Sequence, residues 1–186
     1  MKLKFQDIRD VENYVMILHD FLCLYTTAFP PEERRSEWID EGTISSFIEE
    51  KDDFNIIIAS IDDSFVGFLS YWHFKEYIYI EHFAVEKSNR GKGIGKKILQ
   101  HVIENICGNI ILEVELPNSD ISKRRVNFYK NEGFILWQSI EYIQPAYSEG
   151  QAPVPLMLMT NGDMLLSSAE DEKILEIKNR VYGISL

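Results

Sequence analysis

The stretch Arg90-Gly91-Lys92-Gly93-Ile94-Gly95 decides how the rest of the sequence is interpreted. It follows an apolar run that ends at Val85 and precedes a helical pattern, so it is predicted to join a strand to the start of a helix. The first N–H groups of a helix have no acceptor within the helix and lie at the positive end of its dipole. Because glycines let an anion approach these amides, the turn is predicted to bind a phosphate group.

Two common phosphate loops can be tested by spacing. A dinucleotide fingerprint, G-x-G-x-x-G, requires glycine where the sequence has Lys96 or Ile98, depending on which glycine begins it. A P-loop requires Ser or Thr where the sequence has Lys97. The spacing therefore excludes both.

Charge is distributed unevenly around this turn. The 186 residues are 45% hydrophobic and 26% charged, which is typical of one globular domain and excludes collagen-like and disordered chains. There are 19 Lys and Arg against 30 Asp and Glu, a net charge of −11, yet Lys87–Lys97 holds five basic residues and no acidic one. The acidic remainder argues against nucleic acid or membrane partners, and the basic segment supports a local anion site.

Targeting and redox signals are absent. The N-terminal residues lack the apolar core of a signal peptide, and no apolar run approaches the roughly 18 residues of a spanning helix. Cys23 and Cys107 each lie in an apolar context without a Cys-x-x-Cys pair. We therefore expect a cytoplasmic protein with both cysteines reduced in the core and with no metal.

Hydrophobic periodicity predicts a mixed α/β architecture. Helices are expected over 10–28, over 32–50 in two pieces divided at Gly42, and then over 94–106, 124–131 and 167–181. Strands are expected over 55–60, 65–74 and 77–85 as an antiparallel meander, and then over 110–114, 134–140 and 155–160, with a loop over 144–153. Trp38 and Ile39 are among the residues expected to be buried.

The spacing Arg90-x-x-Gly93-x-Gly95 resembles the acetyl-CoA pyrophosphate loop, R/Q-x-x-G-x-G/A, of the GNAT N-acetyltransferase superfamily. Three further features stand in that family's order: a strand ending Phe83-Ala84-Val85, the strand Ile111-Leu112-Glu113-Val114, and a run from Asn127 to Phe134 that resembles F/L-Y-x-x-x-G-F. The resemblance covers about residues 55–140.

The resemblance implies a GNAT fold, in which helices flank a mostly antiparallel sheet of about six or seven strands. The sheet is expected to splay between the strand ending at Val85 and the strand starting at Ile110. We assign residues 1–160 to this domain. Residues 161–186 are expected to form a helical extension that packs on the same domain or on a dimer partner, and the sequence does not decide between these.

The resemblance also implies acetyl-CoA as cosubstrate. Its pantetheine arm would enter the splay and pair with the backbone of Phe83, Ala84 and Val85, in the manner of an added strand. The residues that would hold the pyrophosphate, by backbone amide or by charge, are Arg90, Gly91, Lys92, Gly93, Ile94, Gly95, Lys96 and Lys97. The alternative for the lysines is that they only solvate the helix. The asparagine found in many members shortly after the second strand is Ser122 here, so contacts beyond Val114 stay open.

Acyl transfer by direct attack in a ternary complex requires an acid for the leaving thiolate and a route for the amine proton. By resemblance Tyr129 is the acid, and a core tyrosine is its alternative. Glu81 or Glu113 is the base, or a water chain replaces both. A salt bridge to Arg124 or Arg125 is the alternative for Glu113.

Strand alternation predicts that Glu81 shares a face with Tyr79 and Phe83, with His82 on the opposite face.

The acceptor surface is expected from the acidic residues 20–50 and from the loop 145–155 with Tyr142 and Tyr147. An acidic, tyrosine-lined opening suits a cationic small-molecule or peptide amine, although acidity also serves solubility. Two other classes stay open: a GNAT-like module that binds acyl-CoA without turnover, and an unrelated nucleotide-binding domain. A homodimer is also left open.

Overall fold

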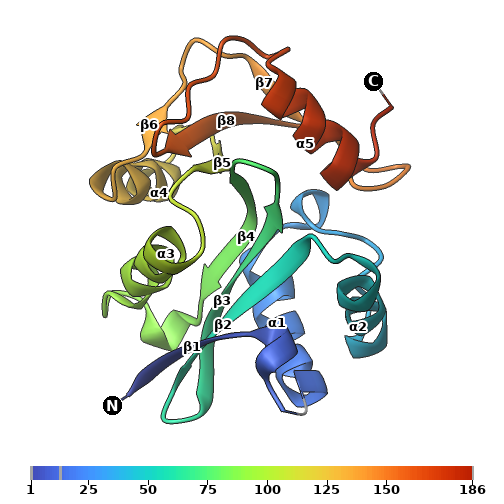
Figure 1. The fold of residues 1–186 in the computed structure, drawn as a ribbon, viewed down its shortest axis with the longest axis vertical. Helices are drawn as coiled ribbons and strands as arrows, with labels where there is room; N and C mark the ends of the chain where they lie inside the picture. Colours follow the sequence, from blue (N-terminus) through green and yellow to red (C-terminus); the bar gives the residue numbers. More distant parts are fainter. Residues whose placement is uncertain (1, 13, 186) are drawn as a thin grey trace.

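A mixed sheet of eight strands runs through the molecule with helices on both faces (Figure 1). The computed structural model describes residues 2–12 and 14–185. The strands are β1 (Leu3–Asp7), β2 (Phe54–Ile61), β3 (Ser64–His73), β4 (Ile78–Val85), β5 (Ile110–Glu115), β6 (Ile135–Leu136), β7 (Tyr142–Gln144) and β8 (Val154–Asn161). They are ordered β1-β2-β3-β4-β5-β8-β6, with β7 on β8, and every pair except β4–β5 is antiparallel.

Five α-helices are present among the described residues, with short 3-10 turns η1 (Ile8–Asp10), η2 (Pro31–Glu33) and η3 (Lys87–Asn89). The α-helices are α1 (Tyr14–Ala28), α2 (Glu41–Glu50), α3 (Ile94–Asn105), α4 (Asp120–Asn131) and α5 (Glu172–Tyr182). Within the described part of the chain, no helix combines the length and apolarity needed to cross a bilayer.

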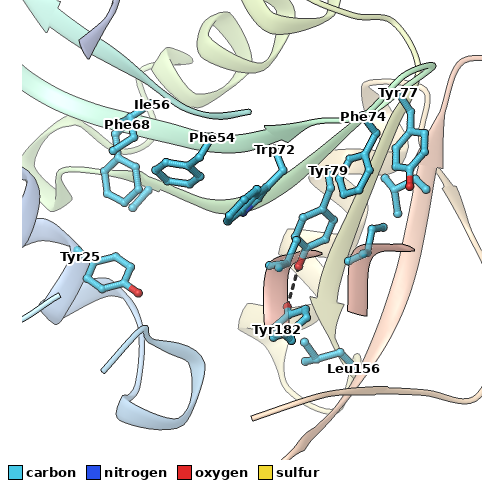
Figure 2. Close-up of a cluster of buried hydrophobic side chains, with 14 of the residues drawn as sticks. Tyr25, Phe54, Ile56, Phe68, Trp72, Phe74, Tyr77, Tyr79, Leu156 and Tyr182 are labelled. Atoms are coloured by element: carbon cyan, nitrogen blue, oxygen red, sulfur yellow. Dashed lines mark hydrogen bonds between the residues drawn. The ribbon is translucent and has the colours of Figure 1, made fainter. Parts of the chain in front are cut away.

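The two faces of the sheet carry different cores. Aromatic side chains fill the core beneath α1, α2 and α5, and Figure 2 shows Phe54, Phe68 and Trp72 in a row along it. Aliphatic side chains fill the other core, where α3 contributes Ile98 and Val102. Burying both faces explains why the central strands read as almost continuous apolar runs.

The predicted mixed architecture and the β2–β4 meander are confirmed. The polar-containing β1 and the short β7 were not predicted, since three to five residues give little periodicity.

Two helix predictions differ from the structure. Gly42 lies in the first turn of α2 and does not divide a helix into two pieces. The helix predicted from 124 begins at Asp120, because Ser119 and Ser122 form a reciprocal capping box. Ser122 is thus a helix-capping residue.

Two burial predictions are wrong. Cys23 is exposed and Cys107 half-buried, and both are free thiols. On α1 the inward residues include Phe21 and Tyr25, so Cys23, two positions from each, faces outward. Ile39 is 76% exposed in the turn before α2, whereas its neighbour Trp38 is buried as expected.

Helix α5 packs on the sheet of the same chain. Its Ile174 and Ile177 are buried in the aromatic core. The hydroxyl of Tyr77 donates to the Lys173 carbonyl at 3.2 Å, and Arg180 forms an ion pair with Asp53. The end of α5 lies beside β4, because the hydroxyls of Tyr182 and Tyr79 are 2.8 Å apart.

The parallel pairing of β4 with β5 is short. It joins Ile78 to Ile110 and ends where Ile80 meets Leu112, although both strands continue. The sheet therefore splays at this point, between the two strands that were predicted to separate.

A β-bulge interrupts β4 just where the splay begins. Ser70 is opposite His82, but Tyr71 is opposite Ile80, so Glu81 is an extra residue without a partner on β3. The Ser70 hydroxyl accepts the His82 N–H at 3.1 Å and so pairs a backbone group at the bulge. Bulges change which side chains point to each face.

The alternation predicted for β4 is therefore wrong from His82 onward, whereas Glu81 lies on the aromatic side with Tyr79, as predicted. Tyr79 belongs to the aromatic core and Phe83 packs against the aliphatic one. His82 lies against Tyr25 on the aromatic side, with Tyr79 and not opposite to it. The extra residue shifts the pattern by one position.

A buried ion pair holds the bulge to the rest of the aromatic core. Arg35 Nη2 lies 2.8 Å from Glu81 Oε1, and both side chains are almost fully buried. The attraction between these opposite charges, both removed from water, ties the bulge to the segment before α2. The guanidinium also donates to the Val181 carbonyl at 3.1 Å and lies 4.7–5.7 Å from the ring centres of Trp38, Phe47, Trp72 and Tyr147.

Replacing Glu81 by Gln is expected to lower the free energy of unfolding by about 3–5 kcal/mol, because it leaves the buried Arg35 charge without its carboxylate. Urea unfolding measures the change.

The matched control is Glu37→Gln. Glu37 contacts the same guanidinium at 3.1 Å, but its side chain is 45% exposed against 0% for Glu81. We expect it to cost less than about 1 kcal/mol. Equal costs for the two variants would show that burial of the Glu81 pair has no special weight.

Candidate active site

A groove of about 630 Å³ opens on one side of the splay. One wall is the free end of β4, and the facing wall is α4. The lining residues are Thr27, Ala28, Phe29, Phe83, Ala84, Val85, Arg90, Gly95, Ile121, Arg124, Arg125, Phe128 and Tyr129. Five of the residues predicted to contact acetyl-CoA line it, together with Tyr129.

The wall formed by β4 offers a strand edge. Beyond Ile80, β4 no longer pairs with β5, so the backbone of residues 81–85 is not paired on that side. Such an edge binds an extended ligand that carries amide groups, in the way that it would accept another strand.

The glycine turn closes one end of this groove. Gly91 and Gly93 have φ values of 74° and 75°, in the left-handed region where a side chain is strained. Gly93 is the N-cap of α3, so the first amides of the helix point out of the turn. Arg90 Nε donates to the Val85 carbonyl at 2.9 Å and fixes the turn to the end of β4.

The basic side chains near the turn differ in whether they already have a partner in the protein or face the groove. Lys96 Nζ forms a 2.8 Å ion pair with Glu132, and Lys92 Nζ donates to Asn89 at 3.2 Å. On the opposite wall, Arg124 and Arg125 line the groove, although they were considered only as partners of Glu113. Arg124 and Phe128 are four residues apart and so lie on one face of α4, and this spacing could have indicated from the sequence that Arg124 lines the groove.

A second, smaller cavity of about 60 Å³ lies within the splay. Its walls come from both strands, from the loop before β8 and from η2. The lining residues are Phe29, Glu33, Ile80, Glu81, His82, Phe83, Leu112, Glu113, Val114, Glu115, Arg125, Tyr129, Gln144, Tyr147 and Leu156. It therefore brings together both carboxylates that were candidates for the base.

Tyr129 borders both cavities. It lies on α4 and packs against Phe128 and Phe134. Burial raises the pKa of Tyr129 to about 12, so the phenol is protonated at neutral pH and can donate a proton.

Glu113 is held by tyrosine hydroxyls. Tyr142 donates to its Oε1, and the Tyr182 hydroxyl lies 3.0 Å from Oε2 and 3.3 Å from Oε1. Burial raises the pKa of Glu113 to about 7, against the lowering effect of these hydrogen bonds. The salt bridge considered as its alternative belongs to a neighbour, because Arg125 pairs with Glu115.

Glu81 has a different environment. Its Oε2 accepts the Trp72 indole N–H at 2.8 Å, and its Oε1 faces Arg35. Beside it, burial lowers the pKa of His82, which is neutral and donates from Nε2 to the Glu33 carbonyl at 2.9 Å. Glu81 is thus an ion-paired carboxylate, whereas Glu113 has only hydroxyl partners.

Several residues of this site were not given a role from sequence, among them Arg35, Tyr79, Gln144 and Tyr182. Tyr142 and Tyr147 were placed at the acceptor opening from their loop positions. For Tyr182, the signal that was available is its spacing with Ile174, Lys178 and Val181 on one helical face.

The arrangement can hold two ligands that meet at Tyr129. A long ligand with an anionic end and amide groups fits the groove, and a small group that donates a proton fits the cavity beside Glu113.

Comparison with known proteins is consistent with this arrangement. Residues 52–136 match the acetyltransferase (GNAT) domain model. YjbC, a Bacillus subtilis (strain 168) protein named as an acetyltransferase, is 26% identical over 156 residues, which are 83% of this chain and 74% of that protein. The ribosomal-protein-S18-alanine N-acetyltransferase of Escherichia coli shares the fold, at 16% identity, with a TM-score of 0.59 over 89% of this chain and all of that one.

A solved structure from Bacteroides thetaiotaomicron, described as a GNAT-family acetyltransferase, is 34% identical. Its TM-score is 0.82, and the match covers 98% of this chain and 99% of that one. Identity at this level over nearly the full length of both chains goes beyond a shared fold, and we conclude that this chain belongs to the GNAT acetyltransferase family.

Proposed function

We propose that this protein transfers the acetyl group of acetyl-CoA to the nitrogen of a cationic amine. The observation that carries the proposal is the position of Tyr129 where the two cavities meet, with Glu113 on the wall of the smaller one. One group can then serve the leaving thiolate while the other serves the incoming amine.

In this proposal acetyl-CoA occupies the groove. The pyrophosphate lies on the amides of the glycine turn, with Arg90 and Arg124 beside the groove, and the pantetheine arm pairs with the free edge of β4. An N–H of that edge near Phe83 donates to the thioester oxygen as negative charge develops on it. This set of donors is fixed by the sheet before substrate arrives.

The acceptor amine occupies the smaller cavity. Carboxylates of Glu33, Glu81, Glu113 and Glu115 line it, against the guanidinium of Arg125. Burial and the nearby Glu115 also raise the pKa of Glu33. A cavity of this charge favours a protonated amine on entry, and its size of about 60 Å³ admits the amino group and its first carbons.

The transfer needs three proton movements. The protonated amine first gives one proton to Glu113 and becomes a neutral nucleophile. Its nitrogen then forms a bond to the acetyl carbon, the carbon–sulfur bond breaks as Tyr129 gives its proton to sulfur, and the nitrogen returns its surplus proton to the Tyr129 phenolate. The products are the acetylated amine and the free thiol of CoA. Glu113 is preferred to Glu81 as base because its partners are neutral hydroxyls and its pKa is about 7, close to the operating pH.

Turnover of acetyl-CoA with a panel of amines tests the function. We expect release of CoA thiol with polyamines, aminoglycosides or basic peptides, and we expect none with amino acids that have acidic side chains, because the cavity carboxylates repel them. Thiol release and mass spectrometry of the product measure this. Turnover of acidic amines alone would contradict the charge argument, and tight CoA binding without turnover of any amine would favour a binding module.

Tyr129→Phe is expected to lower kcat by about 100-fold or more while CoA still binds, because general acid catalysis contributes about that factor. Steady-state kinetics and calorimetric titration with CoA measure the two effects.

Tyr71→Phe is the matched control. Tyr71 is buried in the same aliphatic core, its pKa is also raised to about 12 by burial, and it lines neither cavity. Its kcat should stay within about twofold of wild type, since it has no part in the proton transfers. A similar loss in both variants would show that the Tyr129 effect is structural.

Glu113→Gln is expected to lower kcat/KM about 100-fold or more and to remove the acidic limb of its pH profile. In the wild-type protein Glu113 works ionised, so kcat/KM should rise with pH through about 7. Glu115→Gln, two positions along β5 in the same cavity, should keep this limb. If Glu113→Gln keeps the limb and Glu81→Gln loses it, the base is Glu81.

A further inference from the structure

The last turn of α5 brings one hydroxyl group into contact with the Glu113 carboxylate. Tyr182 is buried, and its hydroxyl lies 3.0 and 3.3 Å from the two carboxylate oxygens. On its other side it lies 2.8 Å from the hydroxyl of Tyr79, as the dashed line in Figure 2 shows. An ionised carboxylate only accepts, so Tyr182 donates to Glu113 and receives the Tyr79 hydrogen.

The two residues before Tyr182 on α5 each contact another part of the chain. The Val181 carbonyl accepts from Arg35, the guanidinium that also pairs with Glu81. Arg180 pairs with Asp53, the residue directly before β2. The neighbours of Tyr182 in the sequence are therefore anchored to two separate elements, and its hydroxyl has a defined position.

Other groups also face Glu113, each from a different element. Tyr142 of β7 donates to Oε1, Tyr79 of β4 lies behind Tyr182, and the charge of Glu81 faces it across the cavity. The ring of Tyr147 packs at a tilt against that of Tyr182, with ring centres 4.9 Å apart. Among the described residues, Tyr182 is the hydroxyl that contacts both carboxylate oxygens.

We propose that α5 completes the active site and that Tyr182 is the positioning residue of Glu113. The proposal rests on the assignment of Glu113 as base. Tyr182 orients the carboxylate toward the cavity and stabilises its ionised form. A chain of two hydroxyls polarises the bond to the carboxylate more than a single hydroxyl does.

The proposal predicts the direction in which the pKa of Glu113 changes when the Tyr182 hydroxyl is lost, and a merely structural tyrosine would not produce that change. Losing the Tyr182 hydroxyl removes a donor to the ionised carboxylate, so the pKa of Glu113 rises. Because the ionised form is the active base, the acidic limb of kcat/KM moves to higher pH.

Tyr182→Phe is therefore expected to shift that limb upward by about one pH unit, the usual size of one charge-assisted hydrogen bond. At pH 6 kcat/KM should fall about tenfold, and at pH 9 it should approach the wild-type value. A pH profile with acetyl-CoA and an accepted amine measures both.

Tyr77→Phe is the matched control. The Tyr77 hydroxyl also bonds to α5, at Lys173 and Glu176, but it lies outside the cavity. It should leave the limb where it is. An equal shift in both variants would overturn the proposal, since docking of the helix alone would then explain the effect.

A direct titration of Glu113 separates this proposal from the proposed function. Side-chain carboxyl NMR of the free protein, with Glu113→Gln to assign the signal, should show the pKa of Glu113 rising in Tyr182→Phe. If the signal moves and the kinetic limb does not, the positioning role stands and the assignment of Glu113 as base fails. If the signal does not move, the positioning role fails whatever the kinetics show.

A second variant guards against a loss of folding in Tyr182→Phe. Tyr79→Phe removes the hydroxyl behind Tyr182 and leaves the contact with Glu113 in place. It should shift the limb in the same direction by a smaller amount, and an unchanged limb in a folded Tyr79→Phe protein would contradict the two-hydroxyl chain.

Discussion

The site depends on one constraint: the parallel pairing of β4 with β5 ends after Ile80 meets Leu112. Both strands continue past that point, so each has a backbone edge that its neighbour does not satisfy. Unpaired strand edges bind extended ligands. The groove forms on that edge and the smaller cavity forms inside the gap. Tyr129 borders both, and the carboxylates lie on the wall of the smaller one.

The bulge at Glu81 and its ion pair with Arg35 border this gap on the aromatic side. A buried charge is costly unless it is paired, so the two side chains stabilise each other only while the bulge, the loop after η2 and α5 keep their positions. The aromatic rings around the guanidinium exclude water and strengthen the pair. A polar contact in the core therefore defines the geometry of the cavity beside it.

Features that depend on neighbouring residues in the chain were predicted well. Local patterns and the family resemblance predict the glycine turn, the meander and the splay. They also predict the position of Tyr129 on the helix that follows β5. The extra residue at Glu81 was not visible, because a bulge shows only in the register with β3. The exposure of Cys23 and the contact of Tyr182 with Glu113, 69 positions apart, depend on how remote elements pack, and one sequence does not carry that information.

The order of strands in the sheet has a consequence for folding. β8 lies between β5 and β6, so it must insert beside β5 after a long stretch of chain has been made. Pairings that are distant in sequence form late and slowly. The groove uses mainly residues 83–129, whereas the smaller cavity needs Tyr147 and Leu156 as well. In a folding intermediate that has β2–β5 and α4 in place but lacks β8, most of the groove wall would already be formed, and the smaller cavity would be completed only when β8 inserts.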